Sequence, residues 1–215
     1  NEKTKIWDYL GKTKDLFYKF TKPKKEEGYK FRVRAVLYVD DRQLFGAYSN
    51  IFSTRAGIDV SSHQGQIDWQ KVKDAGVSFV MIRAGNRGNE TGKFFEDKYF
   101  KDNIEQATSM GFEVGIYFFS YSLNEKEAIE EADWCINKLK EYNMEKKCKY
   151  IVYDFEVCGE KGSRTEKITK AQMDKNAIAF LSEVKNKGFS PILYANKNYL
   201  TNYFNVDSII AAVPS

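Results

Sequence analysis

The sequence has few of the residues that several common kinds of site require. It contains one histidine, His63, and three cysteines, Cys135, Cys148 and Cys158, without the close spacing of metal-binding cysteines. No Gly-x-Gly-x-x-Gly pattern, P-loop or Ser-His-Asp order occurs, so a nucleotide site or a serine-type triad is unsupported. A lone histidine in a loop is an ordinary polar residue in roughly four cases of five. We therefore expect free thiols, no metal and no organic cofactor.

Long apolar runs and a strong charge imbalance are also lacking. No stretch is long and apolar enough to span a membrane. The chain begins at Asn1 without the charged and apolar pattern of a signal peptide. Its 34 basic and 30 acidic residues leave a formal charge of +4, which is too weak and too dispersed to favour nucleic acid. We expect a monomer that neither binds nucleic acid nor inserts into a membrane.

What is present is enough apolar material for a substantial core, divided into two patterns. The 215 residues are 42% hydrophobic and 15% aromatic. The pattern changes near Ser53 to Ala56. The first part is typical of antiparallel β structure, with a polar turn over 39–42 and strands predicted at Leu16–Phe20, Tyr29–Ala35 and Phe45–Phe52. A domain boundary is therefore predicted between residues 54 and 55.

The second part alternates strands and helices. Strands are predicted at Gly57–Val60, Val77–Ala84, Phe112–Ser122, Lys149–Glu156, Ser190–Ala195 and, as a sixth, Ser208–Val213. Helices are predicted at Ile67–Ala75, Lys98–Met110, Glu125–Tyr142 and Ala171–Lys187. Gly76, Gly111 and Gly188 follow three of those helices, as helix ends prefer. This α/β alternation indicates a parallel sheet, either open and doubly wound or closed into a barrel.

Carboxylates and aromatics recur where these strands end. Asp154 and Glu156 stand two positions apart in the fourth strand, so they would project to the same side. Neighbouring like charges raise at least one pKa, which suits acid–base catalysis, although acidic residues that merely cap the next helix are about as common. Six further residues fall near the ends of the other strands: Asp59, Arg83, Tyr117, Phe119, Tyr194 and Asn196. The carboxyl ends of parallel strands form the functional rim of a barrel.

The first part resembles a known module over its last strands only. Residues 28–53 carry Tyr29-Lys30-Phe31-Arg32-Val33-Arg34-Ala35, a loop, and Gly46-Ala47-Tyr48-Ser49. This order is similar to the final two strands of a fibronectin type III module, whose earlier strands are not visible. A small independent hairpin unit is the alternative.

The second part resembles glycoside hydrolase family 25, the muramidase-type lysozymes, over about 140 residues. Five motifs occur in the family's order: Gly57–Gly65 with Ile67-Asp68-Trp69, Phe79–Gly85, Gly115–Ser120, Asp154-Phe155-Glu156 and Pro191–Asn196. Ordered motifs are far more specific than any one of them. The resemblance implies a (β/α) TIM-like barrel over residues 55–215 and hydrolysis of the β-1,4 bond between N-acetylmuramic acid and N-acetylglucosamine in peptidoglycan.

The same resemblance implies roles for the rim residues. Glu156 would be the general acid, Asp154 its ionised partner, and Asp59 a third carboxylate whose charge disfavours ionisation of its neighbours. Arg83, Tyr117, Phe119, Tyr194 and Asn196 would contact substrate. Tyr117 and Phe119 could instead pack inside the barrel, and Arg83 could simply pair with Asp59. Retention, inversion and participation of the substrate's acetamido group all stay open.

The sequence also departs from the family pattern. Phe118 stands where the family usually has Tyr or His. The expected sixth strand lacks the family's Trp-x-Ala-x-Tyr-like motif, and the two strands that should follow are missing, so the sequence predicts an incomplete barrel. The substrate implies a secreted or wall-associated protein, or a phage-type endolysin. A non-catalytic protein that binds wall glycans or mediates adhesion is the alternative function.

Overall fold

The computed structural model describes residues 7–14, 29–39, 42–49, 52–53, 55–156, 159 and 161–214. The chain divides into two compact units, Asn1–Thr54 and Arg55–Ser215. Among the described residues, no helix is both long and apolar enough to cross a membrane.

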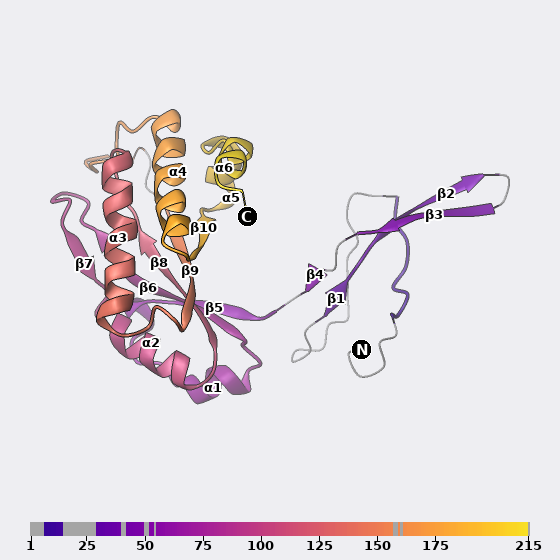
Figure 1. Cartoon of the computed structure of the whole chain (residues 1–215), viewed down its shortest axis with the longest axis horizontal. Coiled ribbons are helices and arrows are strands. Elements are labelled where there is room, and N and C mark those ends of the chain that lie inside the picture. The colour runs from indigo at the N-terminus through magenta and orange to yellow at the C-terminus, as the bar shows by residue number, and fades with distance from the viewer. Residues whose placement is uncertain are drawn as a thin grey trace. The chain divides into compact units, whose positions relative to one another are not determined.

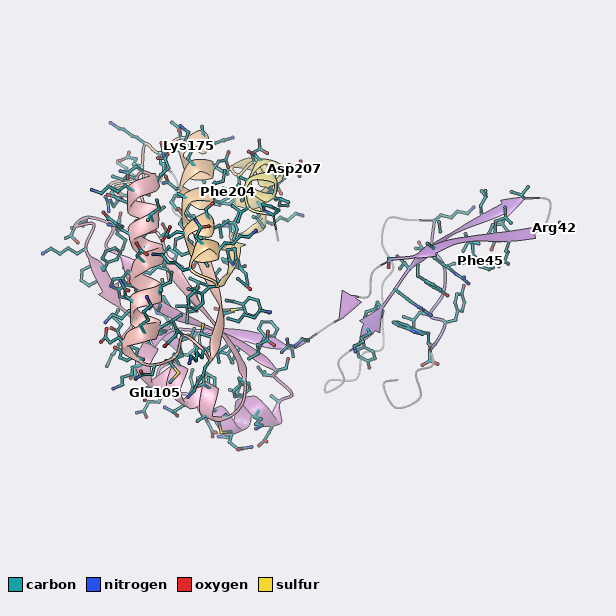
Figure 2. The ribbon with its side chains drawn as sticks, viewed as in Figure 1. Arg42, Phe45, Glu105, Lys175, Phe204 and Asp207 are labelled. Atoms are coloured by element: carbon teal, nitrogen blue, oxygen red, sulfur yellow. The ribbon has the colours of Figure 1, made fainter. Side chains whose placement is uncertain are left out.

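The N-terminal unit is built from short antiparallel pairs. Strand β1 (Lys30–Phe31) pairs with β4 (Phe52–Ser53), and β2 (Arg34–Val39) pairs with β3 (Arg42–Tyr48). The side chains of β2 and β3 are exposed, as Figure 2 shows for Arg42 and Phe45. The antiparallel pattern follows the sequence prediction, but the expected strand over 16–20 lies outside the described residues. These strand pairs do not test the resemblance to a fibronectin type III module, which remains a prediction.

The C-terminal unit is built on a mostly parallel sheet (Figure 1). Its parallel strands are β5 (Gly57–Val60), β6 (Phe79–Arg87), β8 (Glu113–Phe119), β9 (Cys148–Asp154) and β10 (Ser190–Tyr194), in the spatial order β10-β9-β8-β6-β5. All five were predicted within a few residues. Within the described part of the chain, β5 and β10 each have a strand neighbour on one side only, so the expected barrel is not closed.

Helices connect these strands. They are η1 (Ser62–Gln64, a 3-10 turn), α1 (Trp69–Asp74), α2 (Phe100–Ser109), α3 (Glu125–Glu141) and α4 (Lys170–Asn186). Side-chain oxygens of Asp68, Asn124 and Thr169 accept the backbone N–H three residues later, which explains why α1, α3 and α4 start there. Gly111 and Gly188 take φ of 80° and 88° just after α2 and α4, a conformation that glycine adopts without strain.

Strand β6 runs further than the sequence predicted and forms a hairpin. It continues to Arg87 and pairs antiparallel with β7 (Phe94–Glu96), a strand the prediction missed. A bulge at Ala84 shifts the register against β8, so that Gly85 pairs with Phe118. One extra residue reverses the face of every later side chain. The bulge therefore turns Arg87 toward the helices.

The predicted sixth strand over 208–213 is wrong, because that segment is helical. Helix α5 (Lys197–Asn202) and helix α6 (Val206–Ala212) follow β10. Asn205 Oδ1 accepts the backbone N–H of Ser208 at 3.1 Å and starts α6. Ile209 is buried while Ile210 is 60% exposed. This burial pattern fits a strand as well as a helix, so the cap at Asn205 is the feature that favours the helix.

The sheet has one face covered by helices and one face that carries the predicted site. On the covered face, Phe118 packs against Trp134 of α3 and Tyr153 against Phe180 of α4, with ring centroids 5.4 and 4.9 Å apart. Figure 1 shows α3 and α4 side by side over this face. Phe204, labelled in Figure 2, closes the core beside α4, where its ring meets Phe155 edge-on at 6.3 Å. Burying each such ring stabilises the fold by roughly 1.5–3 kcal/mol.

Candidate functional site

The sequence-predicted residues of the strands gather on the face opposite those helices. The register pairs Arg83 with Tyr117, Phe119 with Asp154, and Asp154 with Tyr194 across four adjacent strands. Asp59 lies on β5 beside Met81, which is on the same face as Arg83 because the two are two residues apart. The topology therefore brings six of the eight predicted residues onto one face near the carboxyl ends of the strands.

Asp154 is the most deeply placed carboxylate of this group. It is the last residue of β9, only 6% exposed, and its Oδ1 has no hydrogen-bond partner among the described residues. Burial, followed by the nearby charges of Glu156 and Asp59, raises the pKa of Asp154 to about 7, while Arg83 opposes the rise. Asp154 therefore retains a proton through the acidic range, up to about neutral pH.

Glu156 follows two residues later, but not in the strand. The prediction extended β9 to this residue, whereas the strand ends at Asp154 and Glu156 is half-buried beyond it. Its carboxylate nevertheless stays near the others. The charge of Glu156 is the main cause that raises the pKa of Tyr194, ahead of burial and of the charges of Asp154 and Asp59. Three carboxylates thus act on one exposed tyrosine at the edge of the site.

Arg83 is held by a residue that the sequence prediction missed. Its Nε donates to Asp97 Oδ2 at 2.7 Å, and its Nη2 donates to Ser62 Oγ at 2.8 Å. Burial opposes the charge on Asp97, but N–H donors from Ser62 and Tyr99, together with Arg83, outweigh it and lower the pKa of Asp97. In the described part of the chain, the ion-pair partner of Arg83 is Asp97 rather than Asp59.

Two of the three aromatic residues of β8, Tyr117 and Phe119, are half-buried on the same face. Burial raises the pKa of Tyr117 to about 12, and the charges of Asp59 and Asp154 add to the rise, so its phenol is neutral at ordinary pH. Phe119 meets Tyr121 edge-on at 5.4 Å. Their partial exposure leaves apolar surface beside the carboxylates, suited to the apolar face of a sugar ring.

Asn196 has a local structural task. Its Oδ1 accepts the backbone N–H of Tyr199 at 3.1 Å and so caps α5 at the end of β10. Asn196 is exposed, and its contact with substrate remains a prediction in addition to this capping role.

The histidine and the cysteines were expected to have no catalytic or metal-binding role. His63 is exposed in η1. Cys135 and Cys148 are buried free thiols, and Cys158 lies outside the described residues. Across the residues that the structure describes, His, Cys, Asp and Glu side chains form no group of three or more that could hold a metal ion.

Sequence reasoning missed Asp97 because nothing local marks it. It lies 14 residues from its partner Arg83, in a polar segment without periodicity. Glu131 of α3, in contrast, left a visible signal. It interrupts the apolar stripe formed by Ala128, Ala132, Cys135, Ile136 and Leu139 at helical spacing. A charge in such a stripe predicts a buried partner, which in the structure is Arg87 at 2.7 Å.

Comparison with known proteins identifies relatives of the chain. An autolytic lysozyme of Clostridium acetobutylicum is 27% identical over 158 residues, which cover 74% of this chain and 43% of the relative. A lysozyme of Streptococcus phage Cp-7 is 24% identical over 162 residues, covering 74% and 40%. Lysozyme M1 of Streptomyces globisporus is 37% identical over 78 residues, covering 36% and 24%.

Solved structures show the same fold. The modular autolysin LytC from Streptococcus pneumoniae, in complex with a synthetic peptidoglycan ligand, has a TM-score of 0.62 and 25% identity, covering 83% of this chain and 42% of that one. A family 25 glycosyl hydrolase from Bacillus anthracis has a TM-score of 0.53 and 24% identity, covering 71% and 64%.

These relatives are longer than the chain. The matched part of the chain spans about two fifths of the length of the Clostridium acetobutylicum and phage Cp-7 lysozymes. The model of glycosyl hydrolases family 25 matches residues 58–215, most of the chain and nearly all of the C-terminal unit. The chain belongs to glycosyl hydrolase family 25.

Proposed function

We propose that this protein is a muramidase that hydrolyses the β-1,4 bond between N-acetylmuramic acid and N-acetylglucosamine in peptidoglycan. One observation carries the proposal. Asp154 is buried with a pKa of about 7, beside the charges of Glu156 and Asp59, on the face of the sheet opposite α3 and α4. Glycoside hydrolysis needs a carboxylic acid that keeps its proton near an ionised partner. Membership of the family and the lysozymes among its relatives support the same reaction.

The two carboxylates have different proposed tasks. Glu156 lies beyond the strand end and is more accessible than Asp154, which favours it as the acid that protonates the leaving oxygen. Asp154 would be the ionised partner at the anomeric carbon. In the free protein Asp154 holds a proton up to its pKa of about 7, so in this assignment it acts as the ionised partner once that proton has been released. Asp59 keeps that proton in place by its charge.

The remaining predicted residues would bind the glycan. Tyr117, Phe119 and Tyr194 offer ring faces to the sugars, Arg83 offers a fixed guanidinium, and Asn196 offers an amide at the edge. Peptidoglycan lies outside the membrane, so the protein would act at the cell wall. The open parallel sheet is consistent with part of a TIM-like barrel, and the N-terminal unit with the end of a fibronectin type III-like module.

The test is digestion of purified cell walls, followed by reduction of the new chain ends with borohydride. A muramidase leaves N-acetylmuramic acid at the reducing end, so muramitol should appear and reduced glucosamine should not. We expect Glu156→Gln to lower kcat about a hundredfold or more. Exposed Glu141→Gln on α3 is the matched control, since it removes a surface carboxylate whose partner is Lys138.

Three results would change the proposal. Reduced glucosamine instead of muramitol would assign the other glycosidic bond. Equal activity of Glu156→Gln and wild type, with loss only in Asp154→Asn, would give Asp154 the role of the acid. Wall binding without any new reducing ends would favour the alternative of a non-catalytic wall-binding or adhesion protein.

A further inference from the structure

A buried carboxylate beneath the site is not used by the reaction proposed above. Glu131 lies on the inner face of α3, is fully buried, and accepts from Arg87 Nε at 2.7 Å and from Ser120 Oγ at 2.6 Å. Burial raises the pKa of Glu131 to about 7, since the hydrogen bonds from Ser120 and Arg87 offset only part of the lost solvation. A buried ion pair stabilises a fold weakly, and apolar residues of the same volume often serve better.

The partners of Glu131 stand at the strand ends that carry the site. Arg87 is the last residue of β6, which also bears Arg83. Ser120 follows β8 directly, and its backbone N–H donates to the carbonyl oxygen of Asp154 at 2.8 Å. One carboxylate therefore ties β6 to β8, and through Ser120 it reaches the backbone of the buried acid on β9.

A chain of hydroxyl groups extends this tie to α4. Ser120 Oγ lies 2.9 Å from Ser122 Oγ, which lies 2.9 Å from the hydroxyl of Tyr153. Asn176 of α4 donates from Nδ2 to the carbonyl oxygen of Ser122 at 2.9 Å. We call this set the Glu131 network: Arg87, Ser120, Ser122, Glu131, Tyr153 and Asn176.

Arg87 has a partner for each of its nitrogens. Besides Glu131, it donates to the carbonyl oxygens of Gly92 at 3.0 Å and Glu127 at 2.9 Å, and it lies 3.3 Å from Glu130 Oε2. A fully satisfied network fixes direction as well as distance, because each hydrogen bond accepts only a narrow range of angles. Apolar side chains would fill the same space, but they would not fix how far β6, β8 and β9 are shifted along one another at their carboxyl ends.

We propose that Glu131 is a positioning residue, which fixes the carboxyl ends of β6, β8 and β9 relative to one another and thereby sets the position of Asp154 relative to Arg83. This inference rests on the proposed function, since it assigns Glu131 a task in the same site. It differs from a purely structural role in one respect. Loss of the network should misplace the site even in a protein that remains stably folded.

The test compares three variants. Glu131→Gln keeps the shape of the side chain but replaces one of the two carboxylate oxygens with an N–H₂ group. One of the two donors, Arg87 or Ser120, therefore loses its acceptor. The double variant Arg87→Met/Glu131→Leu replaces the pair with apolar side chains and should retain a free energy of unfolding close to wild type. Glu141→Gln, an exposed carboxylate on the same helix, is the control.

We expect kcat on purified walls to fall about tenfold in the first two variants, with KM within about twofold of wild type, since misplacement acts on the transition state. Amide hydrogen exchange at Ser120 should become about tenfold faster in both, while the control matches wild type in kcat and exchange. Wild-type kcat in the stable double variant, or faster exchange spread evenly over all strands, would overturn the positioning role.

Failure of the proposed function would be recognised separately. If the wild-type protein releases no reducing ends from walls, the muramidase proposal fails whatever the variants do. The positioning role is then decided by the titration of the Asp154 carboxyl, followed by ¹³C NMR. A shifted midpoint in both network variants supports it, and an unchanged midpoint with wild-type exchange at Ser120 overturns it.

Discussion

Asp97 holds the guanidinium of Arg83 through one carboxylate oxygen, Oδ2, which lies 2.7 Å from Nε and 2.6 Å from Nη2. The same oxygen accepts the backbone N–H of Ser62 at 2.9 Å. The side chain of Asp97 is fully buried and that of Arg83 is 19% exposed. This contact fixes a positive charge beside Asp154, where it opposes the rise of that residue's pKa.

Asp97→Asn should therefore destabilise the protein by about 3 kcal/mol, since it leaves a largely buried guanidinium without its counter-charge. The pKa of Asp97 is lowered in the folded protein, so its contribution is present above pH 4 and is lost as the pH falls through the folded pKa. Urea unfolding at pH 7 and pH 3 measures both effects. Exposed Asp102→Asn on α2 is the control, and an equal loss in the control would contradict the assignment.

Asp59→Asn should move the alkaline limb of the pH–rate profile to lower pH. The charge of Asp59 raises the pKa of Asp154, so its removal lets the proton of Asp154 leave at a lower pH than about 7. The position of the limb in kcat/KM is the relevant measurement, because the variant will also lower the height of the profile. Asp74→Asn, which removes an exposed carboxylate at the end of α1, should leave the limb in place. An upward shift in Asp59→Asn would refute this electrostatic account.

Asp154→Asn should stabilise the protein at alkaline pH. The folded pKa of Asp154 is raised from 3.8 to about 7, so the folded state binds the proton more strongly and stability falls as the pH rises between these values. At about 1.4 kcal/mol for each pH unit, the interval corresponds to at most about 4 kcal/mol.

The measurement is the difference between variant and wild type in the free energy of unfolding at pH 4 and pH 8. We expect almost no difference at pH 4 and a gain of a few kcal/mol at pH 8. Taking the difference removes the similar contribution of buried Glu131, which is common to both proteins. A variant that is less stable than wild type at pH 8 would show that the ionised Asp154 carboxylate does not destabilise the folded protein.

The sequence predicted the parallel sheet because its strands and helices are locally consistent. Apolar runs such as Val80 to Ile82 alternate with capped amphipathic helices, and glycine follows three of those helices with positive φ. The face that carries Asp154 followed from the strand ends, whereas Glu156 lies beyond the end of β9. The segment over 208–213 misled the prediction because its apolar run has no period, and the cap at Asn205 decides its helical form.

The supporting residues of the site could not be found in the same way. Asp97 and Arg83 are 14 residues apart, and Glu131 and Arg87 are 44 apart. Ion pairs over such separations form only once the sheet and α3 are in place. Even where Glu131 interrupts an apolar stripe, the sequence does not identify its partner. The bulge at Ala84 adds a second obstacle, because it reverses the face that simple alternation assigns to Arg87.

Arg164 anchors the connection that follows Glu156, and its removal should affect both stability and activity. Its Nη2 lies 2.6 Å from Glu127 Oε1, and its backbone N–H donates to Asn89 Oδ1 at 3.2 Å. The side chains of Arg164 and Glu127 are 15% and 20% exposed, so this ion pair is less accessible to solvent than a surface ion pair. Arg164→Gln should cost about 1–3 kcal/mol of unfolding free energy and lower kcat/KM on cell walls, because residues 161–166 lose a side-chain bond to α3.

Lys187→Gln is the matched control for this prediction. Lys187 also bonds to carboxylates, Glu183 at 3.1 Å and Asp133 at 3.5 Å, but its side chain is 47% exposed. Its loss should change the free energy of unfolding by less than about 0.5 kcal/mol and leave kcat/KM unchanged. If the two variants lose equal stability, shielding does not explain the Arg164 contact. If Arg164→Gln loses stability but keeps wild-type kcat/KM, the anchor supports the fold alone, and the position of Glu156 is set by β9 and the backbone bond from Phe155 to Tyr194.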